Sequence, residues 1–247
     1  MDLYKILLIF QLSVSVLVFL FLSYVSAPYG RFSRGGWGPL INSLTAWILM
    51  ELPAVLTIAV MAWIFRTEIK YSWVFLLIWE FHYIYRTFFF PAMMKHGRKT
   101  FPVSMVVTAL FFNVMNGFIN GYYLFHIRPV GPEWFTSPGF IIGTAIFFTG
   151  FAIHFDSDRR IQSQKPGPGH YIIPRGGMFT YVSGPNYFGE IVMWSGWALL
   201  TWSLAGAAFA LFTFANVFPR GVAGHKWYLE NFEDYPKERK AVIPRIY

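Results

Sequence analysis

The sequence predicts an all-α, polytopic membrane protein, on the basis of its composition, its long apolar stretches and the placement of its basic residues. Only 13% of the 247 residues are charged, whereas 55% are hydrophobic. A soluble domain carries about 25% charged residues, so this chain has too few charges to cover a water-exposed surface of its size. Aromatic residues make up 21% of the chain, which excludes intrinsic disorder because disordered segments lack them.

Seven stretches are apolar enough to form transmembrane helices, since crossing the hydrocarbon core takes about 20 residues. They are residues 6–25, 44–65, 71–90, 101–125, 138–155, 187–202 and 204–218. The last two are short and nearly continuous, so they form either a pair with a tight turn at Ser203 or one bent element; we predict a pair. The first stretch lacks a strong basic start and a good cleavage site, and we expect it to remain as the first span.

The basic residues predict the orientation, because cytoplasmic loops carry an excess of lysine and arginine. Most of the 20 lie in the loops after odd-numbered spans or in the tail from Arg220. The N-terminus and the other loops hold Lys5, Arg66, Lys70 and Arg128. The N-terminus is therefore expected outside and the C-terminus in the cytoplasm. This topology also explains the net charge of +8 without a nucleic-acid partner.

The whole chain, 1–247, is expected to form a single integral-membrane domain, because no internal repeat or long polar segment divides it. The longest interval between spans is about 156–186. It is rich in glycine and proline, as lids and binding loops are, but contains Tyr171 and Phe179, so we expect an ordered cytoplasmic loop. The tail, about 220–247, is expected on the same side. No feature of the sequence indicates an obligate protein partner.

Several kinds of site are excluded by residues that the chain lacks. No cysteine is present, so there are no disulfides, no thiolate nucleophile and no cysteine-ligated metal. No HExxH, GxxxxGK[ST] or strand-linked GxGxxG motif occurs. His126 and His225 have no partner at ligand spacing. We therefore expect no metal site, and any bound nucleotide is expected on a fold other than the Rossmann fold.

Ionisable residues inside the spans are the first candidates for function. Each costs at least about 2.5 kcal/mol there and usually faces the bundle interior. The four are Glu51, Glu80, Arg86 and Glu190. Glu80 is expected to pair with Arg86 and lock helices together. Glu51 is the better candidate for a cavity wall, because Pro53 bends its helix and frees a carbonyl.

Two further polar groups have alternative interpretations. Tyr83 lies one turn from Arg86 and is either a hydrogen-bond donor beside a buried acid or part of an interfacial aromatic belt. Asn113, Asn116 and Asn120 form a stripe on one span, with Gly117 and Gly121 beside them. The glycines are expected to pack helices closely. The asparagines either help this packing or face a cofactor.

A nucleotide phosphate would find several cations on the cytoplasmic side. They are Arg98, Arg159, Arg160, Lys165, Arg175 and Arg220. Backbone N–H groups at the start of the sixth span, near Asn186, are a further potential contact.

Five motifs in the chain are characteristic of one family. The longest are 176–186 (GGMFTYVSGPN), followed by Gly189 and Glu190, and 232–244 (FEDYPKERKAVIP). The shorter ones are 50–53 (MELP), 82–87 (HYIYRT) and 121–124 (GYYL). With these motifs the chain resembles the steroid 5-alpha-reductase family, the 3-oxo-5-alpha-steroid 4-dehydrogenases, and we expect a member of bacterial type. The resemblance extends from about residue 29 to the C-terminus.

The resemblance implies an integral-membrane enzyme that uses NADPH to reduce the 4,5 double bond of 3-oxo-Δ4 steroids such as testosterone and progesterone. Glu51 and Tyr83 would polarise the C3 carbonyl, so that C5 accepts a hydride and solvent protonates C4. Family positions around the cofactor are matched by Arg98, Asn116, His154, Asp158, Asn186, Glu190, Arg220 and Tyr228. The expected partners are a steroid and membrane lipid.

The sequence also departs from the family pattern. The family often has Asn at position 154 and His at positions 156 and 224, where this chain has His154, Asp156 and Gly224. The stretch 159–164 is one residue shorter, and Gln164 replaces an arginine. Arg160 or Lys165 is therefore expected to take over the phosphate contact in this loop.

Two other functions compete with this hypothesis. One is the reduction of another conjugated lipid, such as an enoyl thioester or a sterol, or methyl transfer on a related fold; a carboxyl with a phenol favours a ketone oxygen instead. The other is a transporter or proton channel built on Glu51, Glu80 and Glu190. It is less favoured, because the chain has no internal repeat and because the basic loop and tail would have no role.

Overall fold

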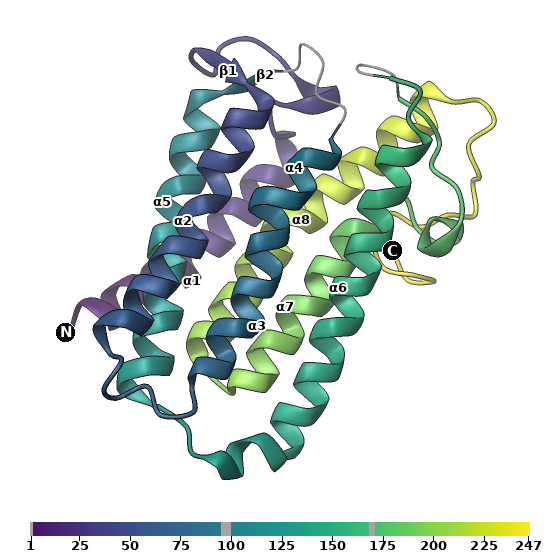
Figure 1. Cartoon of the computed structure of the whole chain (residues 1–247). Helices are drawn as coiled ribbons and strands as arrows, with labels where there is room; N and C mark the ends of the chain where they lie inside the picture. Colours follow the sequence, from purple (N-terminus) through teal and green to yellow (C-terminus); the bar gives the residue numbers. More distant parts are fainter. Residues whose placement is uncertain (1, 95–99, 168–170) are drawn as a thin grey trace.

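Seven long helices form a bundle in the computed structural model, which describes residues 2–94, 100–167 and 171–247 (Figure 1). The helices are α1 (Leu3–Tyr24), α2 (Ser43–Ile64), α3 (Trp73–Ile84), α5 (Val103–Tyr122), α6 (Pro138–Gln164), α7 (Pro185–Thr201) and α8 (Leu204–Asn231). Helix α3 continues through a π-helical turn, η2 (Tyr85–Phe89), into α4 (Phe90–Met93), and α5 continues through a second one, η3 (Tyr123–Ile127).

Short elements connect these helices. Three 3₁₀ turns are η1 (Gly30–Phe32), η4 (Pro132–Thr136) and η5 (Gly177–Thr180). Strand β1 (Leu40–Asn42) pairs antiparallel with β2 (Thr100–Pro102), with Ile41 opposite Phe101. The two strands were not expected from the sequence. They fasten the connections before α2 and α5 to each other at one end of the bundle (Figure 1).

The predicted all-α architecture is confirmed, and each predicted span coincides with one of these helices. Among the described residues, four helical segments are long and apolar enough to cross a membrane: α1, α2, Val103–Ile127 and α6. The total of seven spans and the orientation of the termini stay predictions. Strands β1 and β2, residues 171–184 and the C-terminal segment lie at the same end of the bundle (Figure 1), which is consistent with the charge pattern.

The last two helices form the predicted pair with a turn at Ser203. Trp202 ends α7 in the left-handed conformation, with φ of 46°. Ser203 then caps α8, since its side-chain oxygen accepts a hydrogen bond from the Gly206 N–H at 2.9 Å. A serine at this position satisfies a free N–H of the first helical turn, so the chain reverses without a longer loop.

Two helices continue beyond their predicted ends. Helix α6 runs to Gln164 instead of 155, and α8 runs through Pro219 to Asn231 instead of ending at 218. The expected loop 156–186 is therefore shorter, from residue 165 to 184. The extension of α6 is polar, but ion pairs support it: Asp156 lies 3.3 Å from Arg159 and 2.6 Å from Arg160, at the three- and four-residue spacings that stabilise helices.

Glycines let the helices approach closely. Helices α6 and α7 touch through Gly150, whose Cβ would overlap the backbone of Met193, and Gly189, where a Cβ would lie 2.5 Å from the His154 nitrogen. A Cβ at Gly117 or Gly121 would press on α2 in the same way, at 3.0 and 2.8 Å. The packing role predicted for these last two glycines is confirmed.

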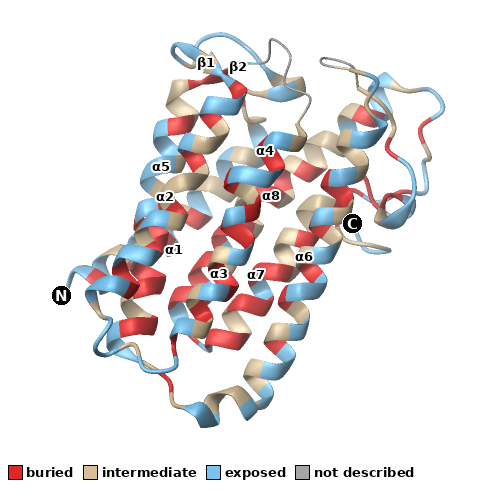
Figure 2. Ribbon diagram, in the orientation of Figure 1, coloured by how far each residue is buried: buried red, intermediate tan, exposed pale blue. Residues whose placement is uncertain are grey.

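Aromatic side chains make up much of the hydrophobic core, and the buried positions along the helices are red in Figure 2. Trp79 from α3 lies 5.5 Å from Trp194 and 5.2 Å from Trp197 of α7, measured between ring centroids, and Phe209 of α8 lies 4.2 Å from Trp194. Trp79 and Trp197 are completely buried. This rigid core holds α3, α7 and α8 in register and fixes the helix walls of the cavity described next.

Candidate active site

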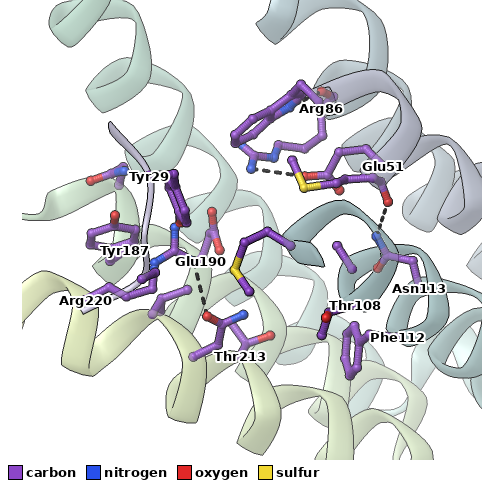
Figure 3. Close-up of a pocket in the computed structure, with 18 of the residues that line it drawn as sticks. Tyr29, Glu51, Arg86, Thr108, Phe112, Asn113, Tyr187, Glu190, Thr213 and Arg220 are labelled. Atoms are coloured by element: carbon purple, nitrogen blue, oxygen red, sulfur yellow. Dashed lines mark hydrogen bonds and ion pairs between the residues drawn. The ribbon is translucent and has the colours of Figure 1, made fainter. Parts of the chain in front are cut away.

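A cavity of about 570 Å³ lies between the helices, with residues of α1, α2, α3, α5, α6, α7 and α8 in its wall (Figure 3). Its size is in the range of about 300–1,000 Å³ that is typical of small-molecule sites. Apolar residues such as Phe21, Met50, Phe112 and Phe212 form most of the wall. Polar groups are concentrated in the centre, with Glu51 and Arg86 on one side in Figure 3 and Glu190, Arg220 and Tyr187 on the other.

Arg86 is the centre of the polar group. Its Nη2 lies 3.3 Å from Oε1 of Glu51, and its Nη1 lies 3.6 Å from Oδ2 of Asp158. The guanidinium lies over the ring of Trp47, at 4.6 Å, and the Trp47 Nε1–H donates to the Arg86 carbonyl at 3.0 Å. Arg86 sits in the π-helical turn η2, a type of turn found frequently at functional sites.

The expected pair between Glu80 and Arg86 is wrong. Arg86 pairs with Glu51 and Asp158, and the Glu80 carboxylate oxygens are buried without a hydrogen-bond partner among the described residues. The reason is helix geometry: with 3.6 residues per turn, residues six apart face different directions. Glu80 does not line the cavity.

His154 connects the two acids on the far side of Arg86. Its Nε2 lies 3.2 Å from Oδ2 of Asp158, and its Nδ1 lies 3.5 Å from Oε1 of Glu190 and 3.1 Å from the Asn186 carbonyl oxygen. The ring is fully buried and lies behind the cavity wall. A buried network of this kind fixes the side chains that it includes, so His154 positions Asp158 and Glu190.

Tyr83 projects from α3 into the same cavity as Glu51. Its side chain is 4% exposed, with its ring 4.9 Å from that of Trp79 and 5.7 Å from that of Trp194. This burial excludes an interfacial aromatic belt. The Tyr83 hydroxyl makes no hydrogen bond to any residue that the structure describes, so it is available to donate to a ligand.

The three asparagines of the stripe have different environments. Asn113 lines the cavity and donates to the Met50 carbonyl at 2.6 Å. Asn116 is fully buried, and its Oδ1 accepts from Gln11 of α1 at 3.1 Å and from Asn120 at 3.0 Å. Asn116 lies outside both cavity walls. The structure therefore places it in helix packing, apart from the other residues predicted to bind the cofactor.

A smaller cavity of about 140 Å³ adjoins the first, because Ile161, Asn186, Tyr187 and Arg220 line both. Tyr228 lines only the smaller one. The structure thus brings together most of the predicted cofactor residues: Asp158, Asn186, Glu190 and Arg220 around the larger cavity, and Asn186, Arg220 and Tyr228 around the smaller one. Arg98 lies outside the described residues.

One residue of this group was missed by the sequence analysis. Arg31, in the connection between α1 and α2, lines the smaller cavity. It lies in a turn with no helical periodicity, so only its place after the matching Tyr29 and Gly30 could have drawn attention to it. Of the two cations expected to take over the phosphate contact in the loop, Arg160 is paired with Asp156 at 2.6 Å, and Lys165 lines the larger cavity.

Metal ligands do not gather in the described part of the chain: no three His, Asp or Glu side chains there form a group that could hold a metal ion.

A cavity with ionisable groups in its wall, set among helices of which several are apolar enough to cross a membrane, defines a membrane-type helical protein. Comparison with known proteins gives the family. A family model described as 3-oxo-5-alpha-steroid 4-dehydrogenase matches residues 99–247. The steroid 5-alpha-reductase DET2 of Arabidopsis thaliana is 40% identical over 236 residues, which covers 92% of this chain and 90% of the relative. The 3-oxo-5-alpha-steroid 4-dehydrogenase 1 of Mus musculus is 39% identical over 241 residues (94% and 92%), and that of Homo sapiens is 36% identical over 244 residues (96% and 93%).

The chain belongs to the steroid 5-alpha-reductase family and is an oxidoreductase that acts on CH–CH bonds. The predicted resemblance is thereby confirmed.

Proposed function

We propose that the protein reduces the 4,5 double bond of a 3-oxo-Δ4 steroid with NADPH, and that Glu51 and Tyr83 polarise the C3 carbonyl. The observation that carries this proposal is the placement of Glu51 and Tyr83 in the wall of one apolar cavity, with the Tyr83 hydroxyl free of any described partner. The names of the relatives support the same reaction.

The larger cavity suits such a substrate. A steroid is a rigid apolar skeleton with few oxygen atoms, and it needs an apolar wall with a small number of hydrogen-bond donors. Met50, Phe112 and Phe212 offer the apolar surface. The donors are concentrated at one place, which fixes the orientation of the ketone.

The side chains act on the charge that develops at the ketone. As a hydride adds to C5, negative charge moves to the C3 oxygen, and donors placed around that oxygen stabilise it. The Tyr83 O–H donates to it, and Glu51 in its protonated form is the second donor. Arg86, 3.3 Å from Glu51, holds that carboxyl toward the cavity and adds positive charge beside the developing enolate. Solvent then protonates C4.

The residues around the two cavities fit a long, phosphate-bearing cofactor. NADPH, when bound, supplies the hydride. Asp158, Asn186, Glu190 and Arg220 would hold it in the larger cavity, and Tyr228 would extend the contacts into the smaller one, while His154 positions the two acids. Arg220 supports this assignment, because its guanidinium contacts Asn216 and the rings of Tyr29 and Tyr187 but no described carboxylate.

We further propose the topology that the charges predict, with 1–247 as one membrane domain, seven spans, an outer N-terminus and a cytoplasmic cofactor side. The basic connections gather at the end of the bundle where the smaller cavity lies. NADPH reaches this end from the cytoplasm, and the connection 165–184 covers it.

The test is an assay of the purified protein in lipid with NADPH and progesterone. Mass spectrometry is expected to show a product with two more hydrogens, dependent on NADPH. Reduction of an enoyl thioester but not of the steroid would assign the protein to another conjugated lipid. No reduction of either substrate would overturn the proposal.

A further inference from the structure

Two guanidinium groups line the smaller cavity without a counter-charge. Arg31 and Arg220 both contribute to its wall, and the wall contains no Asp or Glu among the described residues. Neither arginine has a carboxylate within ion-pair distance in the described part of the chain, whereas Arg86 has two. Cations that are withdrawn from water without a partner cost free energy, so this pair of arginines indicates a bound anion.

Arg31 is held rigidly by aromatic side chains. Its guanidinium carbon lies 4.4 Å from the ring centroid of Tyr228, 4.6 Å from that of Trp227 and 5.2 Å from that of Tyr171. Its Nη2–H donates to the Tyr228 hydroxyl at 3.1 Å. Its Nη1 is buried and has no hydrogen-bond partner among the described residues. One side of the planar group is thus fixed, and the other is left to donate.

The rest of the wall leaves room for a small anion. Asn186 and Ser183 add neutral polar groups, and Gly224 has no side chain to fill the space. A Cβ at Gly224 would meet nothing within 4 Å. The guanidinium fork matches the oxygens of a phosphate, which accepts two N–H bonds at once.

We propose that Arg31 and Arg220 bind a phosphate group of the cofactor in the smaller cavity, and that Arg31 holds the connection between α6 and α7 beside it through Tyr171. This inference rests on the proposed use of NADPH. The phosphate is either the 2′-phosphate or the diphosphate of the dinucleotide. Arg31 therefore takes the role that the sequence suggested for Arg160 or Lys165; Arg160 is paired with Asp156 at 2.6 Å.

The first test compares binding of NADP⁺ and NAD⁺ by calorimetry to the full chain in lipid nanodiscs. Arg31→Ala is expected to weaken NADP⁺ binding about ten- to hundredfold, the usual effect of losing a hydrogen bond to a charged group. Loss of affinity for NADP⁺ alone identifies the 2′-phosphate, and equal loss for both identifies the diphosphate. Unchanged NADP⁺ affinity would overturn the inference.

Arg34→Ala is the matched control, because Arg34 is exposed in the same connection, lies over Trp37 and donates to the Ser26 carbonyl. It removes the same charge and is expected to keep wild-type affinity. Arg31→Lys keeps the positive charge but lacks the planar group that donates two parallel hydrogen bonds. It serves as a second variant in case Arg31→Ala does not fold, and its affinity for NADP⁺ is expected to lie between those of the wild type and Arg31→Ala. If the wild-type protein itself binds no NADP⁺, the proposed function fails, which is a different result from failure of the Arg31 site.

A second test addresses the cavity without changing an arginine. Gly224→Leu is expected to fill the cavity and weaken NADP⁺ binding, while Gly224→Ala leaves it nearly unchanged. Equal affinities of the two variants would contradict the proposed site.

Trypsin cleavage after Arg175 gives an independent measurement, since Arg31→Ala is expected to speed it by releasing Tyr171. Cleavage at the wild-type rate would overturn the proposed hold on the connection.

Discussion

Nη2 of Arg86 lies 3.3 Å from Oε1 of Glu51, across the gap between η2 and α2. Since the other Nη of Arg86 reaches Asp158 of α6 at 3.6 Å, one guanidinium joins three helical segments around the larger cavity. Glu51, the acid proposed to act on the substrate, is therefore oriented by Arg86, which also contacts the Asp158 side chain. This linkage makes activity and stability depend on the same few side chains.

Loss of a donor to the ketone oxygen should lower turnover more than cofactor binding. We expect Glu51→Gln and Tyr83→Phe each to reduce kcat by about 10²–10³, as removal of an oxyanion donor does, while NADP⁺ still binds. Steroid reduction assays with calorimetry on the same samples measure both. Glu80→Gln is the control, because this acid on α3 does not line the cavity and should keep wild-type kcat. Wild-type turnover in both site variants would remove the assigned roles.

Arg86→Met should destabilise the protein, because it leaves the Asp158 carboxylate and the Glu51 carboxyl group without their buried partner. Removing one side of a buried ion pair costs about 3–5 kcal/mol. Thermal unfolding in detergent measures the loss. The matched test adds Glu51→Gln and Asp158→Asn to the same variant, which should restore part of the stability. If the three substitutions destabilised additively, the buried charges would not be interacting.

The close contact of α6 with α7 should be sensitive to a single methyl group. Gly150→Ala places its Cβ against the backbone of Met193 and Gly189, and overpacking of this kind costs about 1–3 kcal/mol. Gly224→Ala, also within a helix, meets open space and should gain about 0.5–1 kcal/mol from helix propensity. Chemical denaturation of both variants gives the comparison, and an equal effect of the two substitutions would argue against the contact.

Stability should fall in mild acid through His225, at the end of α8 beyond the predicted span. Its Nδ1 lies 2.6 Å from Oγ of Ser183, which also lies 2.6 Å from the Tyr235 hydroxyl. Burial, and then the charge of Lys240, lower the pKa of His225. The folded state thus binds fewer protons than the unfolded one, so this stabilisation is complete above about pH 6.5 and decreases as the pH falls through the folded pKa.

The check is the Tm of wild type and of His225→Gln between pH 7.5 and 5.5. The wild-type Tm should fall more steeply than that of the variant, because the variant lacks the titrating ring. Parallel curves would assign the acid sensitivity to other groups.

The positions of the helices could be predicted because apolar runs of about 20 residues have few other folds available. The helix ends could not. The end of α6 depends on Asp156 pairing with Arg159 and Arg160, and α8 continues through Pro219, which local rules treat as a stop. Hydropathy predicts the part of a helix that lies in an apolar medium. It does not predict the residue at which the helical hydrogen bonds of the backbone end.

The site could be predicted where an ionisable residue stands inside an apolar run, because burying such a residue costs free energy. Glu51 inside an apolar run and the family motif around Tyr83 pointed to the cavity that both residues line. The predicted partner of Arg86, Glu80, was wrong, because ion pairing depends on which helices are neighbours in the folded protein. Arg31 was missed for a related reason: its importance comes from Tyr171, Trp227 and Tyr228, which lie far along the chain and meet it only in the folded protein.

The first helix of the chain has its main partner in the last one. Helix α1 packs along α8, and Phe21 of the former and Phe212 of the latter line the same cavity. During synthesis α1 is made well before α8, so it remains without its main neighbour until α8 follows. The larger cavity can therefore be completed only after α8 has been synthesised and has packed against α1.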